Sequence, residues 1–211
     1  MKSYFEVFID RLSEALKKPL PGAEVQYQMA PVGRDREVPE GSSVPRKSAV
    51  TVLLFPEKGK IKLLLIKRVK DDTVHSGQLA FPGGSEERDD QDLVMTAFRE
   101  MYEEVGIQSN AVSLIGKLTP LYISVSNYMV LPVVAYCNSL PELKINHDEV
   151  EEIFKVDLDF LLHPRSRTTR KVTTKYLTDF EVPCFLIGKE VLWGATAMIT
   201  QELLTIVQTI K

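Results

Sequence analysis

Features that mark several specialised classes of protein are scarce in this sequence. Its 211 residues contain only two cysteines, Cys137 and Cys184, and each lies alone in an apolar run. This favours buried, reduced thiols over a disulfide, a cysteine metal site or a cysteine nucleophile. No segment approaches the ~20 continuous apolar residues that cross a bilayer, so no contact with a membrane is expected.

Strong charge of either sign is missing as well. The net charge is −3 and there is no basic tract, which argues against a nucleic-acid-binding protein. A small anionic ligand stays open, because a bound metal makes one site positive even when the whole protein is slightly negative. The 44% hydrophobic and 26% charged residues are typical of a folded, soluble domain.

The first residues, MKSYFEVFIDRLSEALKK, place charges among apolar side chains and lack the apolar run of a signal peptide. Their spacing predicts an amphipathic helix instead. Its apolar side would consist of Phe5, Phe8, Ile9, Leu12 and Leu16. The final Thr-Ile-Lys is not a peroxisomal signal. We therefore expect a cytoplasmic protein.

The rest of the chain predicts an α/β fold with a mixed sheet. Residues 1–47 are expected to hold the first helix and a proline-rich wrapping loop, 18–47, and residues 48–211 the main part of a single domain. Predicted strands are 49–55 and 61–67, which form a hairpin, then 112–118, 130–136, the end of 148–156, and a second hairpin of 171–177 and 184–187. Predicted helices are 92–105, 157–162 and 193–210. Without a regular βαβ rhythm, a mixed sheet covered by helices fits best.

One predicted helix carries the residues with chemical potential. Glu100, Glu103 and Glu104 stand at i, i+3 and i+4, so their carboxylates share a face, while Leu93, Ala97, Met101 and Val105 form an apolar stripe. Carboxylates at these spacings repel one another, and a bound Mg²⁺ or Mn²⁺ would reverse that penalty. Taken alone, such an acidic face is more often simply solvated.

The context favours a metal site. A Gly83-Gly84 loop precedes the helix and lets the backbone approach a ligand, and Gly106 is placed to end the helix. Arg99 is positioned to hold a carboxylate of the preceding loop in a bidentate pair.

REMYEEVGI, residues 99–107, resembles the second half of the Nudix box, G-x5-E-x7-R-E-U-x-E-E-x-G-U, where U is a bulky aliphatic residue. The resemblance implies a Nudix hydrolase with an α/β/α sandwich fold, in which Glu100, Glu103 and Glu104 ligate the metal and Arg99 completes the catalytic set. The first half of the box departs from the pattern. The box glycine falls on Ser85, or on Gly84 with one inserted residue, and the first glutamate falls on Gln91 with Asp90 and Asp92 beside it. We expect altered bracing of the loop rather than lost activity.

The segment before the box, LLLIKRVKDDTVHSGQLAFPGG, resembles the signature of coenzyme A pyrophosphatases. The resemblance implies hydrolysis of coenzyme A or a derivative to 3′,5′-ADP and 4′-phosphopantetheine, by a water that a Mg²⁺ or Mn²⁺ ion activates. The residues that it assigns to substrate binding are Arg68, Gly77, Gln78, Phe81, Gly83 and Gly84. The second basic residue of that signature has no clear counterpart, with Val74 or His75 near its place.

Several alternatives stay open. The substrate can be another nucleoside diphosphate derivative such as ADP-ribose, or a nucleoside triphosphate, or the chain can be a non-catalytic Nudix-fold regulatory module. Arg68 and His75 can be ordinary solvated side chains, and Phe81 a core residue. Glu149 or a box glutamate can be the general base, although Glu149 fits a solvated turn better. The preferred metal and the oligomeric state, including a homodimer, are not determined by the sequence.

Overall fold

A computed structural model describes residues 2–72, 75–174 and 178–211 of the chain. The helices are α1 (Tyr4–Leu16), α2 (Gly22–Gln26), α3 (Leu93–Val105), α4 (Leu158–Leu162) and α5 (Gly194–Gln208), with short 3-10 turns at Tyr27–Met29, Ser109–Ala111 and Pro164–Ser166. The strands are β1 (Arg46–Glu57), β2 (Lys60–Arg68), β3 (Leu79–Ala80), β4 (Gly83–Ser85), β5 (Ser113–Lys117), β6 (Leu121–Ile123), β7 (Tyr128–Tyr136), β8 (Val150–Asp157), β9 (Arg167–Val172), β10 (Phe180–Ile187) and β11 (Glu190–Trp193).

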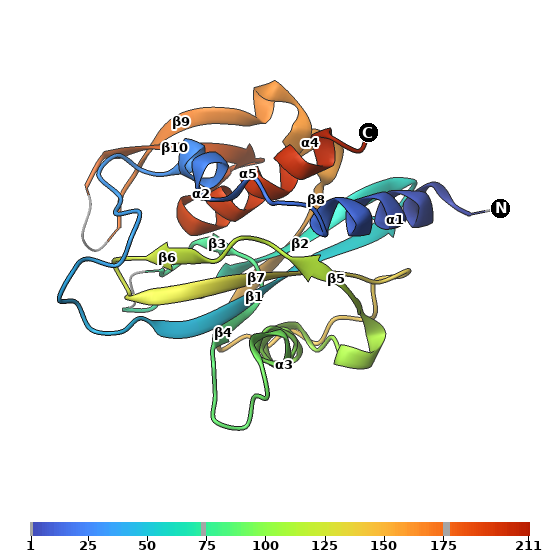
Figure 1. Ribbon diagram of the computed structural model, residues 1–211, viewed down its shortest axis with the longest axis horizontal. Helices are drawn as coiled ribbons and strands as arrows, with labels where there is room; N and C mark the ends of the chain where they lie inside the picture. Colours follow the sequence, from blue (N-terminus) through green and yellow to red (C-terminus); the bar gives the residue numbers. More distant parts are fainter. Residues whose placement is uncertain (1, 73–74, 175–177) are drawn as a thin grey trace.

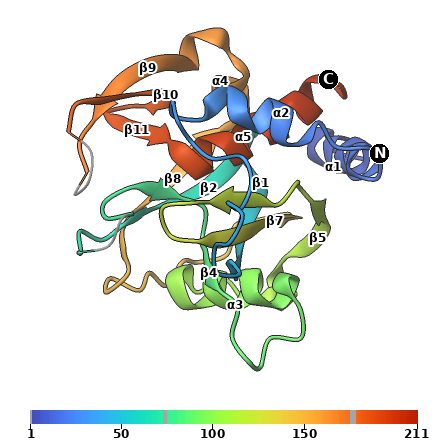
Figure 2. The same cartoon turned by 60° about the vertical axis from the view of Figure 1, so that its left-hand side comes forward.

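The main sheet has the strand order β3-β2-β1-β7-β5. In addition, β4 pairs with β1, β6 with β7 and β8 with β2. β1 runs parallel to β7 and antiparallel to β2, so the sheet is mixed as predicted. The helix α3 covers one face, and α1, α5 and the three-stranded sheet β11-β10-β9 cover the other (Figure 1). The view turned by 60° shows the same three layers (Figure 2).

The alternation of side chains along β1 and β2 explains why both faces are covered. Leu53 and Leu64 pack beneath α3, whereas Leu54 and Leu63 pack toward α5 and α1. Successive residues of a strand point to opposite faces, so a continuous apolar strand requires a covering layer on each side. The apolar runs 49–55 and 61–67 therefore encode a sandwiched hairpin.

The first helix begins with a capping box. Ser3 Oγ accepts a hydrogen bond from the backbone N–H of Glu6 at 3.2 Å, and the Glu6 carboxylate accepts from the N–H of Ser3 at 2.6 Å. These bonds satisfy donors that a helix start leaves free. The predicted apolar side packs as expected, with Phe5, Phe8, Ile9 and Leu12 buried.

Some boundaries were wrong. The proline-rich loop 18–47 contains α2 and a 3-10 turn, which are too short to show a periodic pattern and are held by contacts with α5. Trp193 ends β11 instead of starting the last helix, because it pairs with Cys184 across the sheet. The second hairpin lies at β9 and β10, earlier than predicted, and 175–177 fall outside the described residues. Both cysteines are free and buried, as predicted.

None of the helices in the described part of the chain is long and apolar enough to span a bilayer.

Candidate functional site

The helix α3 is fixed at both ends and along its length. The Asp92 side chain accepts hydrogen bonds from the N–H groups of Val94 and Met95 at 2.8 and 2.9 Å, and Gly106 ends the helix with φ +75°. The buried Thr51 of β1 donates its hydroxyl to the carbonyl of Ala97 at 2.9 Å. The helix α3 is therefore fixed against the central strand β1 and its neighbour β4.

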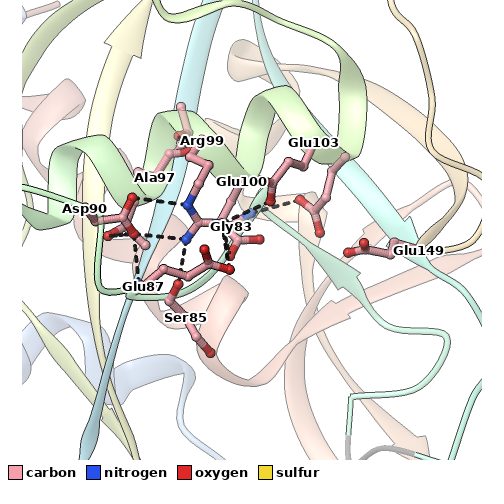
Figure 3. A network of polar contacts seen from close by, with 12 residues as sticks. Gly83, Ser85, Glu87, Asp90, Ala97, Arg99, Glu100, Glu103 and Glu149 are labelled. Atoms are coloured by element: carbon pink, nitrogen blue, oxygen red, sulfur yellow. Dashed lines mark hydrogen bonds and ion pairs between the residues drawn. The ribbon is translucent and has the colours of Figure 1, made fainter.

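Arg99 connects this helix with the loop before it (Figure 3). Its Nη2 donates to the Ser85 carbonyl at 2.8 Å, and its Nη1 lies 3.0 Å from an oxygen of Glu100 and 3.0 Å from one of Glu103. The other edge of the guanidinium binds the carboxylate of Asp90. Asp90 most strongly, and then Glu100, raise the pKa of Arg99, so the side chain is a permanent cation at the centre of an acidic cluster.

Glu100 and Gly84 are in direct contact. A Cβ atom at residue 84 would lie 2.4 Å from Glu100 Oε2, so any larger residue would displace the Glu100 carboxylate. Burial raises the pKa of Glu100, opposed by Arg99. Glu103, one turn further, is 47% exposed.

Glu104 is in a different environment, since its side chain is only 1% exposed. Its Oε2 accepts a hydrogen bond from the N–H of Gly83 at 2.9 Å. Its Oε1 has no hydrogen-bond partner, and its nearest cation, Arg68 Nη1, is 3.6 Å away. Burial raises the pKa of Glu104 to about 8, and the charges of Glu100 and Glu149 add to this. A buried carboxylate with one free oxygen is a costly arrangement that a cation would relieve.

The donor set suits a hard divalent cation, which binds carboxylate oxygens and few other side chains. Within the described residues, however, no three His, Cys, Asp or Glu side chains are arranged as a ligand set. Glu100 and Glu103 instead pair with Arg99, and Glu104 accepts from the N–H of Gly83. Glu104 Oε1 is the atom that best fits a cation.

Glu149 adds a carboxylate from a distant part of the sequence. The N–H of Asn146 donates to the Glu104 carbonyl at 3.0 Å, and the Asn146 side chain reaches Glu149 Oε1 at 3.3 Å. The charge of Glu149 contributes to the raised pKa of both Glu100 and Glu104, and Figure 3 shows Glu149 beside Glu103. From the sequence, the turn that contains Glu149 fitted a solvated acidic turn better than a catalytic one. Its attachment to the end of α3 is a tertiary contact.

A cavity of about 840 Å³ borders this cluster. Gly83, Gly84 and Ser85, the residues that contact Glu104, Glu100 and Arg99, form part of its wall. The remaining lining is mostly apolar and comes from the 31–34 loop, β3, the 123–126 turn and the start of α5. The volume is within the range of small-molecule sites, about 300–1,000 Å³.

Comparison with known proteins agrees with this arrangement. The NUDIX domain model matches residues 45–176, more than half of the chain. The chain belongs to the Nudix family. It is 34% identical over 139 residues to the peroxisomal coenzyme A diphosphatase NUDT7 of Mus musculus, covering 66% of this chain and 58% of that protein. It is 33% identical over 162 residues to the mitochondrial coenzyme A diphosphatase NUDT8 of Mus musculus, covering 75% and 77%. The predicted resemblance to coenzyme A pyrophosphatases and the predicted enzyme class, a Nudix hydrolase, are confirmed.

Among solved structures, RenU, a Nudix hydrolase from M. smegmatis, superimposes with a TM-score of 0.56 at 16% identity, covering 79% of this chain and 88% of that one. At this identity the likeness concerns the fold alone. The predicted Nudix-type fold, a mixed sheet with N- and C-terminal helices, is confirmed.

The incomplete first half of the Nudix box has a structural replacement. Asp90 Oδ2 accepts from the N–H of Glu87 and the hydroxyl of Thr96, both at 2.9 Å, in addition to its bonds from Arg99. The Arg99 bond is the main reason that the pKa of Asp90 falls to about 2. The bracing carboxylate is thus Asp90, one residue before Gln91.

The residues before the Nudix box fall into two groups. Arg68, Gln78, Phe81, Gly83 and Gly84 line the cavity, although Phe81 is also part of the core. Gly77 is set back from the lining residues and instead makes the turn between β2 and β3, with φ +67°.

Two residues of the site were not predicted from the sequence. Arg34 lines the cavity from the loop that follows α2, and no sequence pattern marks it. His75, expected to be solvated or structural, also faces the cavity, and burial lowers its pKa.

Proposed function

We propose that this Nudix protein hydrolyses the pyrophosphate bond of coenzyme A or a derivative, with Mg²⁺ or Mn²⁺ held by Glu100, Glu103 and Glu104. The products would be 3′,5′-ADP and 4′-phosphopantetheine. The main support is Glu104, a buried carboxylate with one oxygen that accepts no hydrogen bond, whose other oxygen accepts from Gly83 in the wall of a cavity of about 840 Å³. A divalent ion, when bound, supplies Lewis acidity toward a phosphoryl oxygen and lowers the pKa of the attacking water.

The chain's own residues have distinct parts in this proposal. Arg99 binds the carboxylates of Glu100 and Glu103 and so orients them next to the loop that precedes α3. The N–H of Gly83 fixes the Glu104 carboxylate, so that its free oxygen keeps one direction. Arg68, at the cavity wall beside Glu104, is placed to bind the pyrophosphate that is cleaved. Glu149, which lies beside Glu103 in Figure 3, is our candidate for the base that takes the proton of the attacking water.

Coenzyme A is favoured over other substrates by two observations. Two curated relatives at 34% and 33% identity carry the name coenzyme A diphosphatase. The cavity also combines a polar end at Gly83–Ser85 with an extended apolar lining, which suits a ligand with both phosphates and a long pantetheine arm. The names of those relatives give different compartments, so the expected cytoplasmic location stays a prediction.

A substrate panel tests the proposal. Coenzyme A, dephospho-coenzyme A, ADP-ribose and a nucleoside triphosphate would be incubated with the protein and Mg²⁺ or Mn²⁺, and the products identified by mass. Hydrolysis in ¹⁸O-labelled water would show which phosphorus atom is attacked. We expect coenzyme A to give the highest kcat/KM. A preference for ADP-ribose by orders of magnitude would contradict the substrate, and ligand binding without turnover would indicate a regulatory module.

Single variants separate the roles. Glu103→Gln should abolish metal-dependent turnover in a folded protein, and Glu149→Gln should reduce kcat by about 10²-fold or more if Glu149 is the base. Glu142→Gln is the matched control, because Glu142 is an exposed carboxylate in the segment before Glu149. Unchanged activity of Glu103→Gln would mean that the acidic helix face is only solvated.

A further inference from the structure

Arg34 is a half-buried cation in the cavity wall. Its Nη2 donates to the Tyr122 carbonyl at 3.1 Å, which fixes the guanidinium beside the 123–126 turn. Its Nε is buried and has no hydrogen-bond partner. Burial lowers the pKa of Arg34, so the site bears a desolvation cost for keeping this charge.

Arg34 shares the cavity wall with two other basic side chains, Arg68 and His75. Burial lowers the pKa of His75, the charges of Arg68 and Arg34 lower it further, and Gln78 and Asp71 oppose the shift. His75 Nε2 is 3.5 Å from Ser126 Oγ, another lining residue. Arg68 faces Glu104, but Arg34 pairs with no carboxylate in the described part of the chain.

The partners of the Arg34 guanidinium are the Tyr122 carbonyl and the Tyr27 side chain, and its Nε–H is unpaired. Such a guanidinium, in a cavity wall that also contains an imidazole and a hydroxyl, is suited to phosphate oxygens. Arg68 lines the cavity where its Nη1 lies 3.6 Å from Glu104 Oε1, and so serves the part of the cavity nearest the Nudix-box helix. Arg34 projects from the 31–34 loop, has no contact with any box residue among the hydrogen bonds of the described residues, and therefore points to a different phosphate.

We propose that Arg34 binds a phosphomonoester of the substrate that is separate from the pyrophosphate under attack. Resting on the proposed function, this assigns to Arg34 the 3′-phosphate on the adenosine of coenzyme A, with His75 and Ser126 beside it. Arg34 would then be a specificity-determining residue that distinguishes substrates with this phosphate from those without it.

Binding of two product analogues tests this without turnover. Calorimetric titration of the full-length protein with 3′,5′-ADP and with 5′-AMP isolates the contribution of the 3′-phosphate. We expect the wild type to bind 3′,5′-ADP more tightly by about 10- to 100-fold, the range for a hydrogen bond to a charged group. Arg34→Gln should remove that preference and leave 5′-AMP affinity within about threefold, and Arg34→Lys should retain part of it.

Arg36→Gln is the matched control. Arg36 lies in the same loop with its guanidinium 5.1 Å from the centre of the Tyr27 ring, and it is exposed. It should keep the wild-type preference. Equal weakening of both ligands by Arg34→Gln, or a wild type that does not discriminate between them, would overturn the proposal. Because the comparison is between ligands on each folded variant, a general loss of stability does not imitate the expected result.

Hydrolysis of coenzyme A and dephospho-coenzyme A gives a second measurement. Arg34→Gln should raise KM for coenzyme A by about tenfold or more and leave that of dephospho-coenzyme A nearly unchanged. A protein that discriminates between the two analogues but hydrolyses neither coenzyme would refute the proposed function and leave the phosphate site standing. Hydrolysis of both with no dependence on Arg34 would refute the phosphate site alone.

Discussion

Asp90 and Arg99 form a bidentate ion pair, with Nε–Oδ1 at 3.1 Å and Nη2–Oδ2 at 3.0 Å. The pair joins the loop after β4 to the middle of α3. It supplies the bracing that the Nudix box normally obtains from a glutamate. Among the described residues, no other ion pair between this loop and the helix uses both oxygens of a carboxylate.

Replacing Asp90 should destabilise the fold, because it removes the ion pair that braces the loop. We expect Asp90→Asn to lower the free energy of unfolding by about 1–2 kcal/mol at neutral pH, because Arg99 loses a charged partner. Asp89→Asn is the control, since Asp89 is adjacent and exposed. Urea unfolding of the three proteins would measure the difference, and equal stabilities would show that the loop is held without Asp90.

The same pair predicts a pH dependence. The folded pKa of Asp90, about 2, lies below its ordinary value of 3.8, so its stabilisation is present above pH ~4 and lost as the pH falls toward 2. The stability difference between wild type and Asp90→Asn should therefore shrink over this interval. A difference that stays constant from pH 6 to pH 2.5 would contradict the assignment.

Glu104 should make the metal-free protein less stable at alkaline pH. Its folded pKa, about 8, lies above its ordinary value of 4.5, so stability falls as the pH rises through this interval. Glu104→Gln should abolish this slope, and Mg²⁺ or Mn²⁺ should raise the melting temperature of the wild type but not of the variant. Melting curves with EDTA and with metal would decide, and a variant that still gains stability from metal would place the ion elsewhere.

Gly84 should be required for activity more than for folding. In Gly84→Ala the new Cβ would meet the Glu100 carboxylate at 2.4 Å, which must move. A displacement of this size at a catalytic group can lower kcat by about 100-fold. Gly41→Ala is the control: it strains a backbone with φ +79° but meets no neighbouring atom and lies away from the cavity, so it can cost stability without lowering activity per folded molecule. Full activity of Gly84→Ala would show that the position of Glu100 is not critical.

Glu202 should be required for folding and not for catalysis. This buried side chain of α5 accepts hydrogen bonds from Gly22, Gln26 and both the N–H and hydroxyl of Thr119. Glu202→Gln turns an amide donor toward these donors, so we expect a loss of about 2–3 kcal/mol. Activity per folded molecule should be retained. Glu181→Gln is the control, because Glu181 is exposed. Unchanged thermal stability of Glu202→Gln would show that this hydrogen-bond network does not hold α2 in place.

The sequence by itself determined the parts that depend on local spacing. Helical periodicity is enough to put Glu100 and Glu104 on one helix, and Gly106 ends that helix because its left-handed backbone is accessible to glycine. The alternating, doubly apolar strands β1 and β2 imply a sheet covered on both faces. The Nudix box is a local motif of this kind, and so it was identified without coordinates.

Only the tertiary structure decided which distant residues complete the site. The choice of Asp90 over Asp92 as the brace depends on how the loop turns, and Asp92 caps the helix instead. Arg34 and Glu149 reach the cavity and the cluster from segments more than forty residues away from α3. No local periodicity relates such positions, since their proximity results from the chain folding back over the sheet, and the burial that sets the pKa of Glu104 arises only in that assembled state.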